Sequence, residues 1–273
     1  MSQNAQPVIA FVGAGNMAYS LVKGLLAGGH AASQIRVADP FEAALEKYAE
    51  TQVATFQDNN PAIIEADVVV LAVKPQVAGD VVRSLAIQPH QLLVSIAAGI
   101  ALNSLSTWTS ENHPIVRCMP NTPALLGVGM TALFANSGCN ETHRANAAYI
   151  LDAAGKTLWV KNEDALDAVT AVSGSGPAYF FRLMEAMIDA GASLGLSREQ
   201  AKELTLQTAY GAALMASQTD DDPATLRENV TSPGGTTEAA LNVMAESGIG
   251  DIVQAALTAA NDRSKSLAEE FGK

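Results

Sequence analysis

Short apolar runs alternate with amphipathic segments along the first half of the chain. The continuous runs predict strands at 8–12, 35–38, 68–73, 92–96, 115–118 and 129–134. Helical spacing follows the first two runs, at 17–26 and 42–50. The run VVVLAV at 68–73 is apolar throughout, as expected of a parallel strand covered on both faces. This alternation predicts a parallel, doubly wound sheet of the Rossmann type, an α/β fold.

The pattern changes after about Asp164, where strand-like runs end and helical patterns continue to the C-terminus. In the segment 178–194, Phe181, Met184, Ile188 and Ala192 recur near one face. Further helices are expected from Asp222-Pro223 and at 237–247 and 251–271.

Two local signals mark where helices begin in this half. The sequence Ser173-Gly-Ser-Gly-Pro177 offers a capping serine and a proline suited to a first turn. Ser197-Arg-Glu-Gln200 has the spacing of a capping box.

These patterns predict two domains, a dinucleotide-binding Rossmann domain at 1–164 and an all-helical domain at 165–273. A helical domain of this size with alanine-rich apolar faces cannot easily bury all of them within one chain. Packing between subunits solves this problem, so a homodimer is expected, with the helical domain forming the dimer contacts.

Composition and net charge limit the kinds of partner that this chain can bind. Hydrophobic residues make up 48 % of the 273 positions, enough for a sizeable core. The formal net charge of −12 argues against nucleic acid or a membrane surface as the main partner. A small anion can still bind where backbone N–H groups point at it.

The sequence gives no sign of a disulfide framework, a signal peptide, a membrane span or a metal site. Two cysteines, Cys118 and Cys139, are no disulfide framework. The polar start MSQNAQP lacks the profile of a signal peptide, and no apolar run is long enough to span a bilayer, so a cytoplasmic location is expected. The four histidines are scattered; we interpret them as loop residues and expect no metal site.

The sequence Gly13-Ala-Gly15-Asn-Met-Ala18 follows a predicted strand and opens a predicted helix. Its first glycine permits a tight turn, its second lets the backbone approach a pyrophosphate, and its small third position allows close helix–strand packing. In this context the motif predicts a nicotinamide dinucleotide site.

Asp39, at the end of the second predicted strand, has two interpretations. It occupies the place of the acidic residue that hydrogen-bonds the adenosine ribose, where it would repel a 2′-phosphate and favour NADH. It is equally a turn residue or helix cap before Pro40, in which case Arg36 or Lys47 remains a candidate for a 2′-phosphate.

Other loops are expected to line the same cleft. Ligands of open α/β sheets bind beyond the carboxyl ends of the strands, where AVKPQ (with Lys74) and SIAAG lie. In the second half, Thr231-Ser-Pro-Gly-Gly-Thr-Thr-Glu238 exposes backbone N–H groups before a helix, which suits a carboxylate. A plain interhelical loop with a threonine cap is the alternative.

The motifs GAGNMA, AVKPQ, SIAAG, RCMPNTPA, DAVTAVSGSGPAYFF and TSPGGTTEAAL occur in this order. In this combination the chain resembles the pyrroline-5-carboxylate reductases over nearly its whole length. The resemblance implies reduction of L-1-pyrroline-5-carboxylate to L-proline with NADPH or NADH, the last step of proline biosynthesis. It also implies an interlocked homodimer that assembles further, commonly into decamers, with an active site between subunits.

The resemblance also implies which residues form the site. Those implied to bind the cofactor are Val12, Gly13, Ala14, Gly15, Asn16, Met17, Asn59, Ala72, Val73, Lys74, Pro75, Ile96, Ala97, Ala98 and Asn229. Those implied to bind substrate are Glu163, Asn229, Gly235, Thr236 and Thr237, with Ser232 close by. Many members have a residue friendly to a 2′-phosphate where this chain has Asp39, which puts an NADPH preference in doubt.

A mechanism follows from this chemistry. Hydride transfer to a protonated cyclic imine needs no enzymic nucleophile, in agreement with the lack of a Ser–His–Asp, Cys–His or paired-carboxylate pattern. We expect the N–H groups of Gly234–Thr237 to hold the carboxylate, Ser232 to assist, and the Thr237 hydroxyl to bond the ring nitrogen. Thr237 and Ser232 are therefore the catalytic candidates, ahead of Lys74.

Two alternatives are kept. A β-hydroxyacid dehydrogenase of the 6-phosphogluconate dehydrogenase kind has similar halves but a catalytic lysine on a helix of the second domain, whereas SGSGPAYFF has none. A non-catalytic dinucleotide-sensing dimer would need the cofactor half but not the polar SPGGTT loop.

Overall fold

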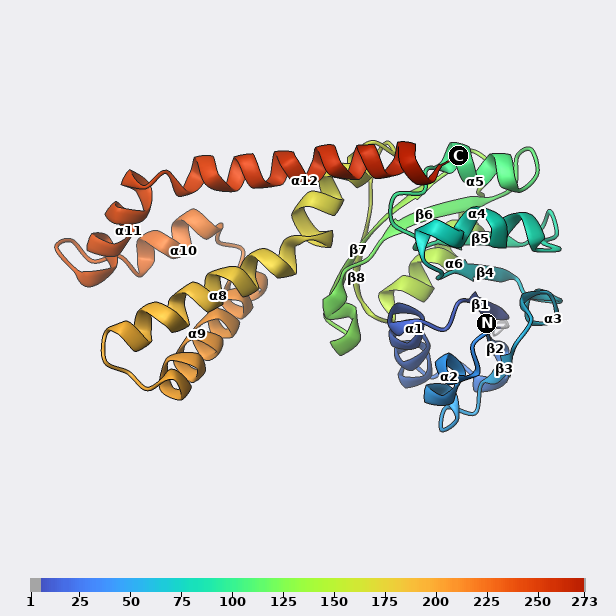
Figure 1. Ribbon diagram of the computed structural model, residues 1–273, viewed down its shortest axis with the longest axis horizontal. Helices are drawn as coiled ribbons and strands as arrows, with labels where there is room; N and C mark the ends of the chain where they lie inside the picture. Colours follow the sequence, from blue (N-terminus) through green and yellow to red (C-terminus); the bar gives the residue numbers. More distant parts are fainter. Residues whose placement is uncertain (1–5, 273) are drawn as a thin grey trace. The chain divides into compact units, whose positions relative to one another are not determined.

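The computed structural model describes residues 6–272, which form two compact units (Figure 1). Unit 1 is the chain up to Ser175 together with the segment from Ala259 onward, and unit 2 is Gly176–Thr258. Helix α7 (Ala165–Val169) begins at the predicted change from α/β to helical pattern, yet it packs against strands of unit 1. The domain boundary after residue 164 stays a prediction.

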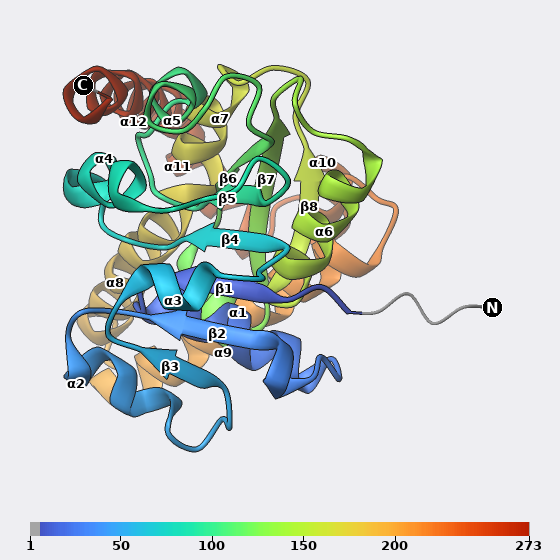
Figure 2. The ribbon, with the colours of Figure 1, turned by 90° about the vertical axis from the view of Figure 1, so that its right-hand side faces the viewer.

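Unit 1 is built on one eight-stranded sheet in the order β3-β2-β1-β4-β5-β6-β7-β8 (Figure 2). Its strands are β1 (Ile9–Val12), β2 (Ile35–Ala38), β3 (Ala54–Phe56), β4 (Val68–Leu71), β5 (Leu92–Ser95), β6 (Ile115–Met119), β7 (Gly129–Ala135) and β8 (Gly155–Trp159). Neighbouring strands are parallel except for β6 and β7. The predicted α/β fold with a Rossmann-type parallel sheet is therefore confirmed.

The antiparallel pair has a simple cause. The segment 120–128 between β6 and β7 contains only the short 3₁₀ turn Thr122–Leu126, too little chain for the crossover helix that a parallel pair requires. β7 therefore runs back along β6, with Cys118 opposite Leu133.

Helices cover both faces of the sheet because the central strands are buried on both sides. One face packs against α1 (Asn16–Ala27), α2 (Glu42–Leu45) and α6 (Glu141–Asp152). The other packs against α3 (Asn59–Ile63), α4 (Pro75–Ser84) and α5 (Leu102–Trp108). Close packing of α1 on α6 depends on Gly24, where a Cβ would lie 1.9 Å from the Ala153 carbonyl oxygen.

Two strands that the hydrophobic pattern does not predict, β3 and β8, lie at the two edges of the sheet. Edge strands are exposed on part of their surface, so they need no continuous apolar run. In β8, Lys156 and Leu158 are exposed while their neighbours are half-buried.

Unit 2 contains α8 (Gly176–Ser193), α9 (Arg198–Gln218), α10 (Pro223–Asn229), α11 (Thr236–Glu246) and the first part of α12 (Ile249–Phe271). The capping box at Ser197–Gln200 and the helix expected from Asp222-Pro223 are confirmed, and the Asp222 carboxylate caps this helix by accepting the Thr225 N–H. The sequence predicted a capping serine in the segment 173–177 and a proline in the first turn. Helix α8 does begin at Gly176, next to Pro177, but Ser173 is no cap, because the chain is already helical there, in a π-helical turn at Thr170–Gly174. The Ser173 hydroxyl instead donates to the Val169 carbonyl oxygen.

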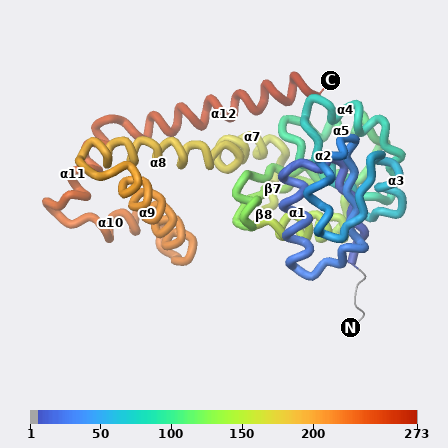
Figure 3. The backbone as a smooth tube through the Cα atoms, turned by 60° about the horizontal axis from the view of Figure 1, so that its bottom comes forward, coloured from blue at the N-terminus to red at the C-terminus, as the bar shows by residue number. Residues whose placement is uncertain are grey.

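The last helix, α12, is continuous across both units, and its C-terminal part lies beside α4 and α5 (Figure 3). The Ser264 hydroxyl donates to the Asp167 carboxylate at 2.7 Å, and the Ser104 hydroxyl donates to the Gly272 carbonyl oxygen at 2.7 Å. Phe271 packs against the core beneath α4 and α5. The end of the chain is thus an integral part of unit 1.

No helix within residues 6–272 combines the length and apolar character that a membrane crossing requires.

Candidate cofactor and substrate site

The glycine turn after β1 presses its backbone against the neighbouring strand. Gly13 has a φ of +100°, and a Cβ there would lie 2.7 Å from the Ala72 carbonyl oxygen. In the described chain no side chain caps the N-terminus of α1, and its first turn has no acidic residue. The uncapped N–H groups and the positive end of this 12-residue helix therefore suit a phosphate.

The other predicted cofactor loops follow the strands beside β1. Lys74 occupies the N-cap position of α4, whose first residue is Pro75. Asn59 begins α3 after β3, and Ile96–Ala98 follow β5. Because these strands are parallel, their carboxyl ends lie at one edge. Unit 1 thus places the predicted cofactor residues from Val12 to Ala98 along one edge of the sheet.

Asp39 belongs to the same edge, and its carboxylate is engaged with the chain itself. One oxygen accepts the Ala14 N–H at 2.9 Å and the other accepts the Phe41 N–H at 3.0 Å. Asp39 therefore braces the glycine turn, as a turn residue does. The competing interpretation, a ribose contact, requires the same oxygens to accept further hydrogen bonds.

Two aromatic residues beside this edge were not predicted. Tyr19 from α1 and Tyr48 pack edge to face, with ring centroids 5.2 Å apart. The Tyr48 hydroxyl has no hydrogen-bond partner among the described residues, and burial together with the charge of Asp39 raises its pKa. Sequence periodicity gave no signal for them, because the aromatic pair forms only when α1 and the segment after α2 meet.

Glu163, predicted to contact substrate, forms a largely buried ion pair with Arg117. The Arg117 guanidinium donates to Glu163 Oε1 at 2.6 Å, and the same oxygen accepts the Leu102 N–H at 2.7 Å. The side chains are 8 % and 25 % exposed, respectively. Glu163 therefore joins β6 to the start of α5, next to the loop 96–101.

The motifs MPNTP and SGSGP meet within unit 1 through Asn121. Its amide nitrogen donates to the Ser173 carbonyl oxygen at 3.1 Å, and its amide oxygen accepts the Met130 N–H at 2.9 Å. These residues hold the π-helical turn against the β6–β7 connection. Such turns are frequent at functional sites.

The loop SPGGTT precedes α11 in unit 2. Gly234 has a φ of +72° and donates its N–H to the Glu238 carboxylate at 2.7 Å, while Gly235 donates to the Ser232 carbonyl oxygen at 3.0 Å. Two of the four N–H groups expected to hold a carboxylate therefore already have acceptors, one in the loop and one in α11. Thr236 and Thr237 form the first turn of α11, where N–H groups have no acceptor in the helix.

The remaining predicted residues are placed as follows. Asn229 is the last residue of α10, and Ser232 is exposed. Burial raises the pKa of the thiols of Cys118 and Cys139, so both stay protonated at neutral pH. Within residues 6–272 no three His, Cys, Asp or Glu side chains are grouped so as to hold a metal ion.

The interpretation of the histidines as loop residues is wrong for His143, which lies in the first turn of α6 and completes a capping box with Asn140. His30 and His113 lie in loops but are buried. Burial lowers the pKa of His113, and repulsion from His143 lowers it further. Burial also lowers the pKa of His30 and of His143, partly opposed by backbone hydrogen bonds.

We expect the protein to lose stability on acidification from pH 7.5 to 5.5, with a fall in Tm of a few degrees. An unfolded histidine takes up a proton near pH 6.5. Because the folded pKa values lie lower, the unfolded state binds more protons, and stability falls as the pH drops through and below this value. Thermal unfolding of His113→Gln should show a weaker pH dependence. The exposed His90, as His90→Gln, serves as the control, and equal slopes for wild type and His113→Gln would contradict the role of His113.

Comparisons with known proteins cover both parts of the chain. Residues 163–267 match the family model described as pyrroline-5-carboxylate reductase dimerisation, and residues 8–99 match NADP oxidoreductase coenzyme F420-dependent. A pyrroline-5-carboxylate reductase of Pseudomonas aeruginosa is 53 % identical over 98 % of this chain and 99 % of its own.

Solved structures agree. A pyrroline-5-carboxylate reductase of Coxiella burnetii has a TM-score of 0.92 at 41 % identity, covering 96 % of this chain and 99 % of its own. The Plasmodium falciparum enzyme, solved with NADP bound, has a TM-score of 0.83 at 31 % identity, covering 96 % and 98 %.

Proposed function

The chain belongs to the pyrroline-5-carboxylate reductase family. We propose that residues of unit 1 bind the cofactor of this reaction and that residues of unit 2 bind its substrate. The protein is an oxidoreductase that reduces L-1-pyrroline-5-carboxylate to L-proline with NAD(P)H. The assignment rests on similarity to reductases of that name over nearly the whole length of the chain.

Unit 1 binds the cofactor in this proposal. The N-terminus of α1 would hold the pyrophosphate, Gly13 would allow its close approach, and the loops at Ala72–Pro75 and Ile96–Ala98 would provide further cofactor contacts. Asp39 keeps the turn in shape through the Ala14 N–H. The cofactor, when bound, supplies the hydride for C5 of the imine.

Unit 2 orients the substrate. The Thr236 and Thr237 N–H groups at the start of α11 bind the carboxylate, because the helix end carries partial positive charge there. The Thr237 hydroxyl donates to or accepts from the ring nitrogen, and Ser232, Gly235 and Asn229 complete the polar surround. Holding carboxylate and nitrogen together fixes where C5 lies, which is the main catalytic task for a reactive iminium.

Glu163 enters this scheme in two ways. The family resemblance makes it a substrate contact, whereas its hydrogen bonds make it a support for the start of α5. We propose that support is its first role, with Arg117 as its partner.

The protein is a dimer, as the dimerisation model over residues 163–267 indicates. Apolar side chains exposed on unit 2 in the single chain supply a surface for the second copy; they include Phe180, Phe181, Leu204, Tyr210, Val243 and Ile252. We propose that residues 165–273 form this dimerisation and substrate domain, that dimers assemble into a decamer, and that the protein is cytoplasmic. Two free thiols suit a reducing compartment.

A coupled measurement tests the function. Oxidation of NADPH and NADH is followed by absorbance with pyrroline-5-carboxylate, and L-proline is identified by chiral chromatography. We expect turnover only when the imine is present. Tight cofactor binding without turnover would favour a dinucleotide sensor. Reduction of NAD(P)+ by a 3-hydroxy acid, without turnover of the imine, would favour a β-hydroxyacid dehydrogenase.

A further inference from the structure

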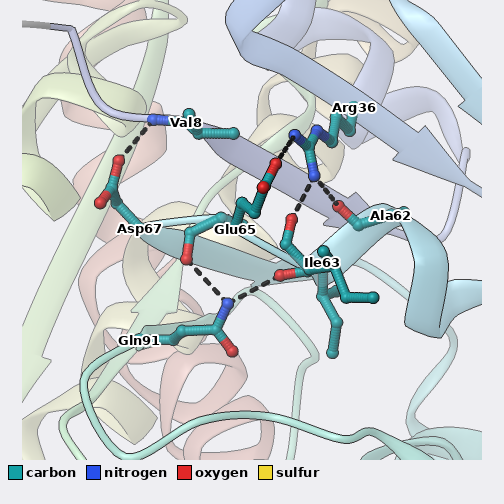
Figure 4. A network of polar contacts seen from close by, with 9 residues as sticks. Val8, Arg36, Ala62, Ile63, Glu65, Asp67 and Gln91 are labelled. Carbon is teal, nitrogen blue, oxygen red and sulfur yellow. Dashed lines mark hydrogen bonds and ion pairs between the residues drawn. The ribbon is translucent and has the colours of Figure 1, made fainter.

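Two cations near β2, Arg36 and Lys47, are candidates for the 2′-phosphate that distinguishes NADPH from NADH. Arg36 donates to the carbonyl oxygens of Ala62 and Ile64 and lies 3.3 Å from a Glu65 carboxylate oxygen (Figure 4). Its side chain is only 19 % exposed. Arg36 therefore stabilises the connection between α3 and β4, and its guanidinium N–H groups already bond acceptors within the chain.

Lys47 is held differently. Its Nζ lies 5.7 Å from the centroid of the Tyr19 ring and 5.8 Å from that of Tyr48, within the range of cation–π attraction. The two rings are fixed against each other at 89°. Among the described residues no carboxylate forms an ion pair with this ammonium. Lys47 thus keeps its charge available at a fixed place.

That place is beside the predicted cofactor edge. Tyr19 belongs to the first turns of α1, directly after the glycine turn, and its N–H donates to the Gly15 carbonyl oxygen. Burial lowers the pKa of Lys47, and the negative charge of Asp39 partly opposes this, so the ammonium and the carboxylate attract each other. The carboxylate of Asp39 already accepts two backbone N–H groups, which offset part of its repulsion for a phosphate.

We infer that Lys47 binds the 2′-phosphate of NADPH and so makes this chain accept NADPH in spite of Asp39, an inference that rests on the proposed function. An ammonium is a compact point charge that suits a phosphate. The 2′-hydroxyl of NADH carries no charge that the ammonium could neutralise. Lys47 should therefore raise the affinity for NADPH and leave the affinity for NADH nearly unchanged.

Isothermal titration with 2′,5′-ADP and with 5′-ADP tests this inference without turnover. We expect wild type to bind 2′,5′-ADP more tightly. Lys47→Met should weaken 2′,5′-ADP about tenfold, the effect of one lost hydrogen bond to a charged group, and change 5′-ADP less than about twofold. Lys47→Arg should keep most of the preference, because the positive charge remains.

Lys23→Met is the matched control, because its Nζ also lies 5.7 Å from the Tyr19 ring but on the exposed side of α1. Equal loss of both ligands in Lys47→Met would assign Lys47 a structural role and overturn the inference. So would an unchanged preference, an equal loss in Lys23→Met, or a wild type that binds both nucleotides equally. Turnover of wild type with NADH, measured separately, shows whether the proposed function itself fails.

Discussion

Thr237→Ala is expected to lower kcat/KM for pyrroline-5-carboxylate by about 10- to 100-fold, as expected for a lost hydrogen bond to a charged group. The hydroxyl is the part of Thr237 assigned to the ring nitrogen, and alanine keeps the backbone N–H assigned to the carboxylate. The first turn of α11 should also persist, since its N-cap is Gly235 and not Thr237.

The measurement is steady-state kinetics at saturating cofactor, together with cofactor affinity from fluorescence titration. Affinity for NAD(P)H should stay within about twofold, because the glycine turn and α1 lie in unit 1. Thr237→Ser retains the hydroxyl and should retain most of the activity. Unchanged kinetics in Thr237→Ala would remove this residue from the mechanism.

Glu163→Leu is expected to destabilise the protein by about 3 kcal/mol, the lower end of the range for breaking a buried ion pair, because Glu163 is partly exposed. The substitution leaves the Arg117 guanidinium buried without its partner and removes the acceptor of the Leu102 N–H. Denaturant unfolding measures the loss. In the double variant Arg117→Met, Glu163→Leu the buried charge is gone, so part of the stability should return.

Glu163→Gln separates the structural from the substrate role. The amide oxygen can still accept from Arg117 and Leu102, so most of the stability should remain, and a large rise in KM would then reveal contact with substrate. Equal stability of the Glu163→Leu variant and the double variant would show that the unpaired Arg117 charge costs nothing.

The hydrophobic pattern predicted what is buried and regular. The run 68–73 contains β4, whose residues are buried on both faces, and the glycine turn lies where the motif placed it. The hydrophobic pattern did not predict the edge strands β3 and β8, because partly exposed strands contain no continuous apolar run. The pairing of Arg117 with Glu163, 46 positions apart, depends on where β6 and the start of α7 meet, which no local pattern encodes.

The candidate site shows the same division. The motifs predicted the cofactor loops, because turn geometry and a helix N-terminus are local properties of a few residues. The meeting of Lys47 with Tyr19 joins two elements across a packed face, so only the fold reveals it. Asp39 fitted two interpretations as a sequence, and its hydrogen bonds to Ala14 and Phe41 support the one in which it braces the turn.

The return of α12 to unit 1 has a consequence for how the protein is made. Residues up to Ser175 leave the ribosome well before the segment from Ala259 onward, yet both belong to one compact unit. Ser104 and Asp167 acquire their partners Gly272 and Ser264 only after the whole of unit 2 has been synthesised. The first unit to emerge is therefore the last to be finished, and its final packing follows translation of the complete chain.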